Sequence, residues 1–276
     1  MIKSLCATTT LYNGVEMPWL GLGVFKAANG EEAVNSVKTA IDAGYRSIDT
    51  ASAYKNEESV GQGIKDSHVV RNELFITSKV WNPDQGYETT LQAFEDSLNR
   101  LDLSYLDLYL IHWPVSGKYK ETWKALEKLY KEGRIRAIGV SNFQVHHLED
   151  LMQDANIKPM VNQVEFHPYL TQKELRAYCK QQGIQLEAWS PLGQGKILDH
   201  EVLVKIGGKY NKTPAQIILR WDIQNEIVTI PKSVKKNRII ENASIFDFEL
   251  TQEDMDSLEG LNQNRRFGSD PDNFNF

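Results

Sequence analysis

Short apolar runs alternate with stretches of helical periodicity along most of the chain. Several of the runs are β-branched and have no polar face, which is typical of buried parallel strands. The predicted strands lie at 74–79, 106–112, 135–141, 160–165, 185–190 and 227–232. Between them, hydrophobic residues recur with the spacing of one helix face, as in Val34, Val37 and Ile41 before Gly44. The pattern therefore predicts repeated strand–helix units.

Local signals mark where some of these elements begin. T-Q-K-E at 171–174 reads as a capping box, and T-P-A-Q at 213–216 places proline at the first helical position. The Asn-Gly pair within T-L-Y-N-G-V-E (10–16) predicts a hairpin ahead of the strand–helix units.

The spacing of polar residues at strand ends predicts the architecture. These residues are Asp49, Lys79, His112, Ser141, Gln163, Ser190 and Lys232. Each interval is about one βαβ unit, roughly 30 residues, and the last leaves room for an inserted loop or helix. With a first strand near 20–23 there are eight units, as in a (β/α)8 TIM barrel. We therefore predict an α/β fold, one barrel domain over residues 1–276, with a short N-terminal β-hairpin and extra C-terminal helices.

Composition and charge narrow the classes of function. The 276 residues are 41% hydrophobic and 25% charged, as in soluble globular proteins, and the net charge is −6. This charge argues against nucleic-acid and anionic-membrane partners, and with no obvious exposed apolar helix it favours a monomer. The N-terminus has no apolar stretch of signal-peptide length and no run is long enough to span a membrane, so we expect a cytoplasmic protein. Cys6 and Cys179 match no metal-binding spacing, and no metal is expected.

Four polar residues are predicted to meet at one end of the barrel. Asp49, Lys79 and His112 end strands two, three and four, and Tyr54 lies in the loop after strand two. A tyrosine pKa of ~10 is too high for ready proton donation, but a neighbouring ammonium lowers it. We therefore expect Asp49 to hold Lys79, Lys79 to lower the pKa of Tyr54, and His112 to orient a substrate oxygen. For each residue alone a structural role is the commoner outcome, and only their convergence favours a proton donor aimed at a carbonyl.

A carbonyl reduction needs a hydride, which no side chain supplies, so a nicotinamide cofactor is implied. G-L-G-V-F-K at 21–26 lacks the third glycine of a Rossmann motif, and we expect its glycines to let the chain pass close to a ligand. Lys232, Ser233 and Arg238 would suit a 2′-phosphate, which favours NADPH. From these residues alone, a solvated basic face is an equally good interpretation.

Five motifs, in order over nearly the whole chain, resemble those of the aldo-keto reductases. They are G-Y-R-S-I-D-T-A-S-A-Y (44–54), I-T-S-K-V-W (76–81), L-I-H-W-P (110–114), G-V-S-N-F (139–143) and I-P-K-S-V-K-K-N-R-I-I-E-N (230–242). The resemblance implies a catalytic tetrad of Asp49, Tyr54, Lys79 and His112, with Tyr54 as general acid, and favours phosphate binding at 231–242.

The same resemblance implies further binding residues. The nicotinamide amide would be bound by Ser141, Asn142 and Gln163, and the pyrophosphate would lie along Ser190, Leu192, Gly193 and Gln194. The 2′-phosphate would be bound by Lys232, Ser233 and Arg238, and the adenine by Glu241 and Asn242. The substrate would be surrounded by Phe25, Trp81 and Trp113. Trp189 takes the position where the family stacks an aromatic, usually tyrosine, on the nicotinamide, although core packing would be the simpler explanation of this residue alone.

The tail R-R-F-G-S-D-P-D-N-F (265–274) resembles the bacterial branch that includes glyoxal and diketogluconate reductases. A short tail implies an open pocket and broad specificity. We therefore expect NADPH-dependent reduction of small aldehydes and ketones, glyoxal and methylglyoxal among them. The alternatives are a diketogluconate-type sugar ketone reductase, a non-catalytic NADPH-binding redox sensor, and a phosphate-binding barrel isomerase that leaves the tyrosine, lysine and histidine unused.

Overall fold

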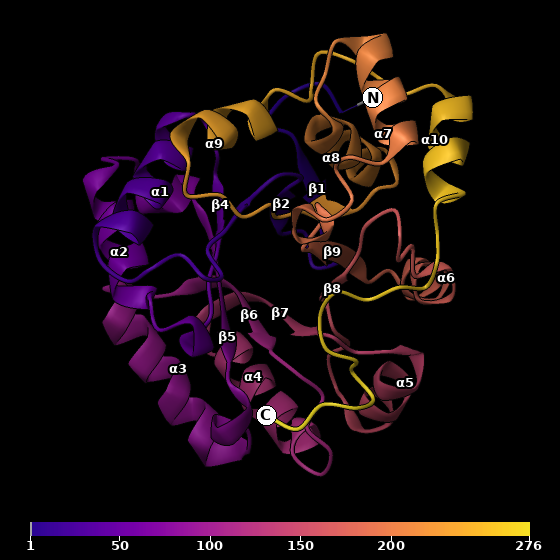
Figure 1. Ribbon diagram of the computed structural model, residues 1–276. Coiled ribbons are helices and arrows are strands. Elements are labelled where there is room, and N and C mark those ends of the chain that lie inside the picture. The colour runs from indigo at the N-terminus through magenta and orange to yellow at the C-terminus, as the bar shows by residue number, and fades with distance from the viewer. Residues whose placement is uncertain (1) are drawn as a thin grey trace.

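The computed structural model describes residues 2–276, in which parallel strands close into a barrel (Figure 1). Eight strands within this range pair in the order β10-β9-β8-β7-β6-β5-β4-β3. Parallel bridges from Leu20 to Thr229 and from Gly23 to Lys232 join the first strand to the last. The predicted (β/α)8 barrel is confirmed. The prediction of one domain over residues 1–276 includes Met1, which lies outside the described residues, and stays a prediction.

The barrel strands agree closely with the predicted apolar runs. They are β3 (Leu22–Gly23), β4 (Ser47–Asp49), β5 (Phe75–Val80), β6 (Leu106–Ile111), β7 (Ile135–Ser141), β8 (Val161–Glu165), β9 (Gln185–Trp189) and β10 (Val228–Thr229). All six residues of β5 and of β6 are buried. These strands are buried on both faces because helices cover the outside of the barrel and side chains fill the inside.

Helices surround the barrel (Figure 1). They are α1 (Glu31–Asp42), α2 (Glu57–Asp66), α3 (Tyr87–Leu101), α4 (Tyr119–Lys131), α5 (Val145–Asp154), α6 (Lys173–Gln182), α8 (Pro214–Gln224) and α9 (Lys236–Ala243). Two more are added to this ring: α7 (Glu201–Tyr210) lies in the long connection between β9 and α8, and α10 (Gln252–Glu259) follows α9. No helix within residues 2–276 combines the length and the apolar character needed to cross a bilayer.

The two predicted helix starts have different outcomes. Pro214 is the first helical residue of α8, as expected, and Thr213 caps this helix because its Oγ1 accepts from the backbone N–H of Gln216 at 3.4 Å. The capping box predicted at Thr171 is wrong. Helix α6 begins after Gln172, which has a left-handed φ of 50° and whose side chain donates to the backbone oxygen of Glu165 at 3.0 Å. The backbone N–H of Thr171 donates to Asn262 Oδ1 at 3.1 Å, and this long-range contact also holds the chain outside the capping geometry.

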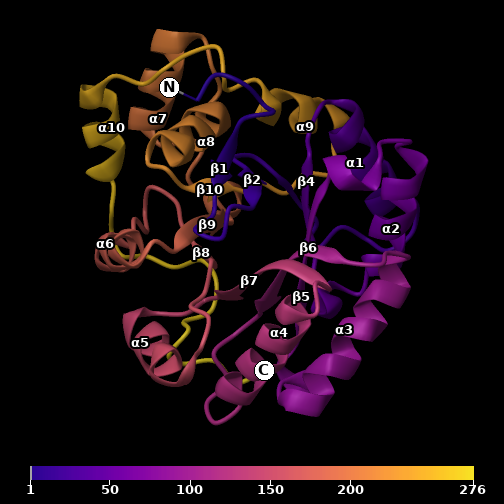
Figure 2. The ribbon, with the colours of Figure 1, turned by 180° about the vertical axis from the view of Figure 1, so that it is seen from behind.

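The predicted hairpin closes the end of the barrel where the strands begin (Figure 2). It consists of β1 (Thr8–Thr10) and β2 (Glu16–Pro18), which pair antiparallel. Thr9 Oγ1 donates to Gln185 Oε1 at the start of β9, at 3.1 Å, and Asn13 Nδ2 donates to the backbone oxygen of Arg136 in β7, at 3.0 Å. The opposite end, where the strands finish, stays available for a site.

The glycines of the 21–26 segment have a packing role that differs from the expected one. A Cβ on Gly23 would lie 2.9 Å from the backbone oxygen of Ile230, and a Cβ on Gly21 would lie 2.8 Å from Ser47 Oγ. Glycine is therefore needed where the first barrel strand packs against its neighbours. Gly23 also lines the cleft described below, but a strand rather than a ligand excludes its side chain.

Candidate active site

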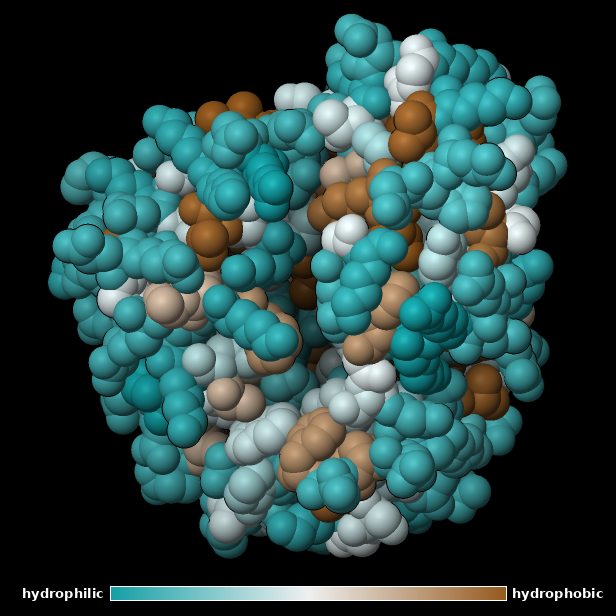
Figure 3. All heavy atoms as spheres, in the orientation of Figure 1, coloured by the Kyte–Doolittle hydropathy of each residue, from teal (hydrophilic) through white to brown (hydrophobic). Residues whose placement is uncertain are grey.

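A cleft of about 540 Å³ opens at the carboxyl ends of the strands, and Figure 3 shows it as a hollow in the face of Figure 1. Many of the predicted site residues line it. They are Phe25, Asp49, Tyr54, Trp81, His112, Trp113, Ser141, Asn142, Gln163, Trp189, Ser190, Gln194 and Lys232. Predicted residues that do not line this cleft are Lys79, beneath it, and Leu192, Gly193, Ser233, Arg238, Glu241 and Asn242.

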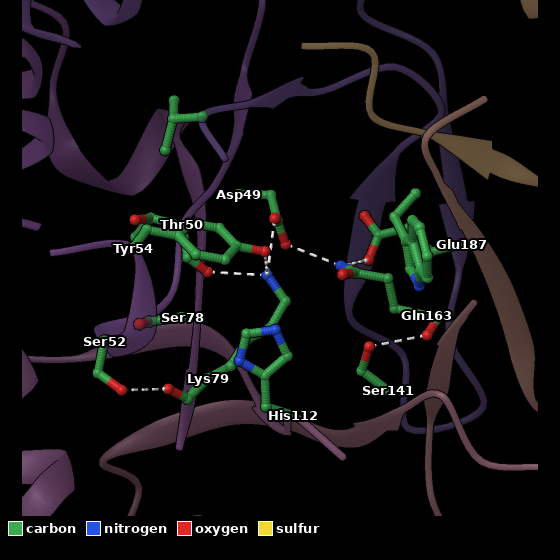
Figure 4. A network of polar contacts seen from close by, with 12 residues as sticks. Asp49, Thr50, Ser52, Tyr54, Ser78, Lys79, His112, Ser141, Gln163 and Glu187 are labelled. Atoms are coloured by element: carbon green, nitrogen blue, oxygen red, sulfur yellow. Dashed lines mark hydrogen bonds and ion pairs between the residues drawn. The ribbon is translucent and has the colours of Figure 1, made fainter. Parts of the chain in front are cut away.

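Lys79 is fully buried beneath the cleft, where an ammonium is costly unless its hydrogens are all satisfied. Its Nζ donates to Asp49 Oδ1 at 2.7 Å, to the backbone oxygen of Thr50 at 2.9 Å and to Tyr54 Oη at 3.4 Å (Figure 4). Three acceptors match the three hydrogens of the ammonium. Because Tyr54 Oη accepts this bond, its own hydrogen is free to be donated into the cleft.

The pKa of Tyr54 moves in the direction opposite to the one expected. Burial raises the pKa of its phenol above the usual 10, and the positive charge of Lys79 only partly offsets this. The expected lowering effect of Lys79 is present, but the prediction of a lowered pKa is wrong because it left out desolvation. As a result, the phenol is protonated at neutral pH and is able to donate a hydrogen bond or a proton.

His112 flanks the phenol as a neutral imidazole. Burial, followed by the charge of Lys79, lowers the pKa of His112 well below its usual value. Its ring lies 5.7 Å from that of Tyr54, centroid to centroid, and its Nδ1 is buried without a partner within residues 2–276. A neutral imidazole carries a single N–H donor, which suits orientation of a carbonyl oxygen next to the phenol.

Aromatic side chains form the walls of the cleft, and the C-terminal tail supplies part of them. Phe25 lies 5.0 Å from Tyr54, centroid to centroid. Trp81 stacks on Phe276 at 5.8 Å with an interplanar angle of 7°, and Trp113 lies edge-on to the same ring at 5.2 Å. The short tail thus narrows the pocket, whereas the sequence implied an open one.

The tail is also held by two histidines of α5. Asp272 Oδ1 lies 3.0 Å from His146 Nε2 and 3.5 Å from His147 Nε2. His147 Nδ1 accepts a hydrogen bond from the backbone N–H of Gln144 at 3.1 Å, so its ring proton lies on Nε2 and faces Asp272. The nitrogen that a metal would need is therefore protonated, and this group docks the tail. The expectation that the protein needs no metal stays a prediction.

The predicted nicotinamide-binding residues lie side by side on β7, β8 and β9, with Asn142 directly after β7. Asn142 Nδ2 donates to the backbone oxygen of His112 at 3.0 Å, and Asn142 Oδ1 accepts from Trp189 Nε1 at 2.8 Å. Trp189 is only partly buried and borders the cleft, so its ring is available for stacking and is not merely core packing. Gln163 Nε2 donates to Asp49 Oδ2 at 2.8 Å and to Glu187 Oε2 at 2.7 Å.

Sequence reasoning missed Glu187, although a signal was present. Glu187 stands two residues before Trp189 on the same strand, so the two side chains share one face. Because Trp189 was expected to stack on the nicotinamide, the two-residue period of a strand would have placed Glu187 inside the barrel as well. Phe276 was also missed, because no local pattern indicates where a chain end will dock.

The predicted 2′-phosphate site lies beside the cleft at the start of α9. Lys232 and Arg238 are exposed and form no ion pair with any residue from 2 to 276. No side chain caps α9, so the N–H groups of its first turn are free to bind an anion. Unpaired cations beside free backbone donors fit a phosphate. The predicted adenine residues fit less directly, because Glu241 Oε1 accepts from Thr213 Oγ1 at 2.9 Å and Asn242 is buried.

A parallel barrel with a buried aspartate–lysine pair beneath a tyrosine defines the class of protein. The chain belongs to the aldo/keto reductase family, whose model matches residues 19–263. It is 72% identical over 276 residues to the glyoxal reductase of Bacillus subtilis (strain 168), covering 100% of both chains. It is 47% identical over 268 residues to methylglyoxal reductase DkgA of Escherichia coli (strain K12), covering 96% of each. The crystal structure of a Gox0644 mutant in complex with NADPH superposes with a TM-score of 0.93 at 44% identity, covering 98% of both chains.

Proposed function

We propose that this protein reduces small aldehydes and ketones, glyoxal and methylglyoxal among them, to alcohols with NADPH. The observation that carries the proposal is the phenol of Tyr54, whose oxygen accepts from Lys79 at 3.4 Å and whose hydrogen is free to face the cleft. Relatives with the same function in their names, at 72% and 47% identity, support the substrate class.

The residues of the chain divide the work between them. Tyr54 donates its proton to the carbonyl oxygen, and His112 directs that oxygen towards the phenol. Lys79, held charged by Asp49, stabilises the phenolate that remains. NADPH, when bound, supplies the hydride to the carbonyl carbon. The aromatic walls would exclude water and enclose small carbonyl compounds.

The side chains near the cleft support NADPH as the cofactor. Ser141, Asn142 and Gln163 would hold the nicotinamide amide, and Trp189 would stack on the ring. Ser190, Leu192, Gly193 and Gln194 would lie along the pyrophosphate, and Glu241 with Asn242 near the adenine. Lys232, Ser233 and Arg238 would hold the 2′-phosphate, because the two exposed cations form no ion pair within residues 2–276 and are available to an anion. The NADPH complex of the relative at 44% identity agrees with this choice.

The test is direct. The pure protein is mixed with NADPH and a panel of glyoxal, methylglyoxal and 2,5-diketogluconate, and loss of reduced nicotinamide is followed by absorbance. We expect the two small dicarbonyls to have the highest kcat/KM. A higher value for the sugar ketone would favour the diketogluconate alternative. NADPH binding without turnover of any carbonyl would favour the redox sensor, and lack of NADPH binding would favour the isomerase.

Cofactor choice is tested at Arg238. Replacing this exposed cation, Arg238→Ala, should weaken NADPH binding roughly tenfold or more while changing NADH binding less than twofold, because only NADPH carries the 2′-phosphate. Binding is measured by quenching of tryptophan fluorescence. Equal losses for both cofactors would contradict the phosphate contact. The monomeric state and the cytoplasmic location stay predictions.

A further inference from the structure

Glu187 is a fully buried carboxyl that the proposed mechanism does not use. It lies on β9 directly opposite Gln163 of β8 in the parallel register. Within residues 2–276 it forms no ion pair, and its Oε1 has no hydrogen-bond partner. A carboxyl in this position is costly, so its single hydrogen bond to Gln163 needs a reason beyond packing.

The amide of Gln163 is held between two carboxyl groups. A primary amide has two N–H hydrogens and one oxygen. Its Nε2 lies 2.7 Å from Glu187 Oε2 and 2.8 Å from Asp49 Oδ2, so both hydrogens have acceptors (Figure 4). The Oε1 of Gln163 accepts no hydrogen bond from residues 2–276, and the side chain borders the cleft.

This arrangement disfavours the reversed amide. If the amide turned by 180°, its oxygen would lie against Asp49, whose carboxylate is paired with Lys79 and offers only acceptor oxygens, and two N–H groups would face the cleft. Burial, followed by the charge of Asp49, raises the pKa of Glu187 to about 8. A carboxyl that is mostly protonated at neutral pH still accepts through its carbonyl oxygen, and it avoids a second negative charge beside Asp49.

We propose that Glu187 is a positioning residue which, together with Asp49, fixes the amide of Gln163 so that Oε1 faces the cleft as an acceptor for the NH2 of the nicotinamide carboxamide. The inference rests on the proposed function, because it assigns the nicotinamide to this part of the cleft. It adds a second buried carboxyl to the site, one that acts through Gln163 and does not touch the cofactor.

The test compares the binding of two cofactors without turnover. Dissociation constants are measured by fluorescence quenching for NADPH and for its 3-acetylpyridine analogue, in which an acetyl group replaces the carboxamide and no NH2 can be donated. The parent protein should bind NADPH roughly five- to tenfold more tightly than the analogue, the factor expected for one hydrogen bond. Glu187→Leu should lose most of this preference by weakening NADPH alone, whereas Glu187→Gln, which retains an acceptor oxygen, should keep it.

Variants of Gln163 complete the design. Gln163→Leu should abolish the preference, and adding Glu187→Leu to it should cause no further loss, because the two residues act through one contact. Thermal melting checks that each variant folds, and Glu187→Met replaces Glu187→Leu if the latter does not.

Each further outcome has a defined meaning. Glu187→Leu with the preference intact, or with equal losses for both cofactors, would overturn the positioning role while leaving the proposed function standing. A parent protein without any preference would instead refute the carboxamide contact of Gln163 itself, and the inference with it.

Discussion

The hydrogen bond between Lys79 and Tyr54 decides the direction of proton transfer in the cleft. Lys79 Nζ also binds Asp49 and the backbone of Thr50, so the ammonium has no hydrogen left for a substrate. In the proposed mechanism, the phenol hydrogen of Tyr54 is then the donor that the substrate meets. Desolvation would keep that hydrogen in place, and the ammonium would stabilise the phenolate after proton transfer.

Tyr54→Phe should reduce kcat by roughly 100-fold or more, because a positioned general acid contributes about that factor. NADPH affinity should stay within about twofold, since only the hydroxyl is deleted. Stopped-flow measurement of nicotinamide oxidation with methylglyoxal gives the first value and fluorescence quenching the second. Activity close to that of the parent protein would show that another group donates the proton.

The raised pKa of Glu187 predicts a pH-dependent stability. The native carboxyl, with a pKa of about 8 against its usual 4.5, keeps a proton that the unfolded chain releases between these values. The unfolded state then binds fewer protons, so the stability contributed by this group falls as pH rises from 4.5 to 8. Glu187→Gln lacks this titration. The Tm of Glu187→Gln minus the Tm of the parent protein should therefore be larger at pH 8 than at pH 5. If thermal melts give the same difference at both pH values, the raised pKa of Glu187 is contradicted.

At the scale of elements, one helical glycine is required by the packing of two helices and another is not. Gly61 lies within α2, where a Cβ would come 2.2 Å from the backbone oxygen of Leu101 at the end of α3. Gly208 lies within α7, where a Cβ would meet no atom within 4 Å. The first glycine lets two helices approach, and the second only adds backbone freedom to the unfolded chain.

Gly61→Ala and Gly208→Ala should therefore have opposite effects. Gly61→Ala should lower the free energy of unfolding by about 1–3 kcal/mol, because a backbone oxygen must move. Gly208→Ala should raise it by about 0.5–1 kcal/mol through helix propensity. Urea denaturation of both variants gives the comparison. The same sign for both would show that the contact between α2 and α3 adapts without strain.

At the scale of the molecule, the tail joins distant parts of the chain over the cleft (Figure 1). Buried Glu165 accepts the backbone N–H groups of Phe267 at 2.7 Å and Gly268 at 3.2 Å. Beyond this anchor the tail continues to Phe276, which stacks on Trp81. The last three residues therefore narrow the cleft beside Trp81 and Trp113, while the anchor at Glu165 does not depend on them.

Removing Phe274–Phe276 should widen the pocket without affecting cofactor binding. The ratio of kcat/KM for phenylglyoxal to that for methylglyoxal should rise about two- to tenfold, because loss of the aromatic stack frees room and weakens the hold on small carbonyls. Steady-state kinetics with both substrates measures the ratio, and NADPH affinity is the control. An unchanged ratio would mean that the tail does not limit substrate size.

The sequence alone determined the strands, about half of the helix positions, the barrel and the convergence of Asp49, Tyr54, Lys79 and His112. These follow from local periodicity and from the rule that parallel strands in a barrel end at one face. Tertiary structure decided the failed cap at Thr171, the bridge between Gln163 and Glu187, the docking of Phe276 and the raised pKa of Tyr54. Each of these features depends on which distant segment comes into contact and on how much water that contact removes. The local pattern of residues encodes neither the contact nor the desolvation.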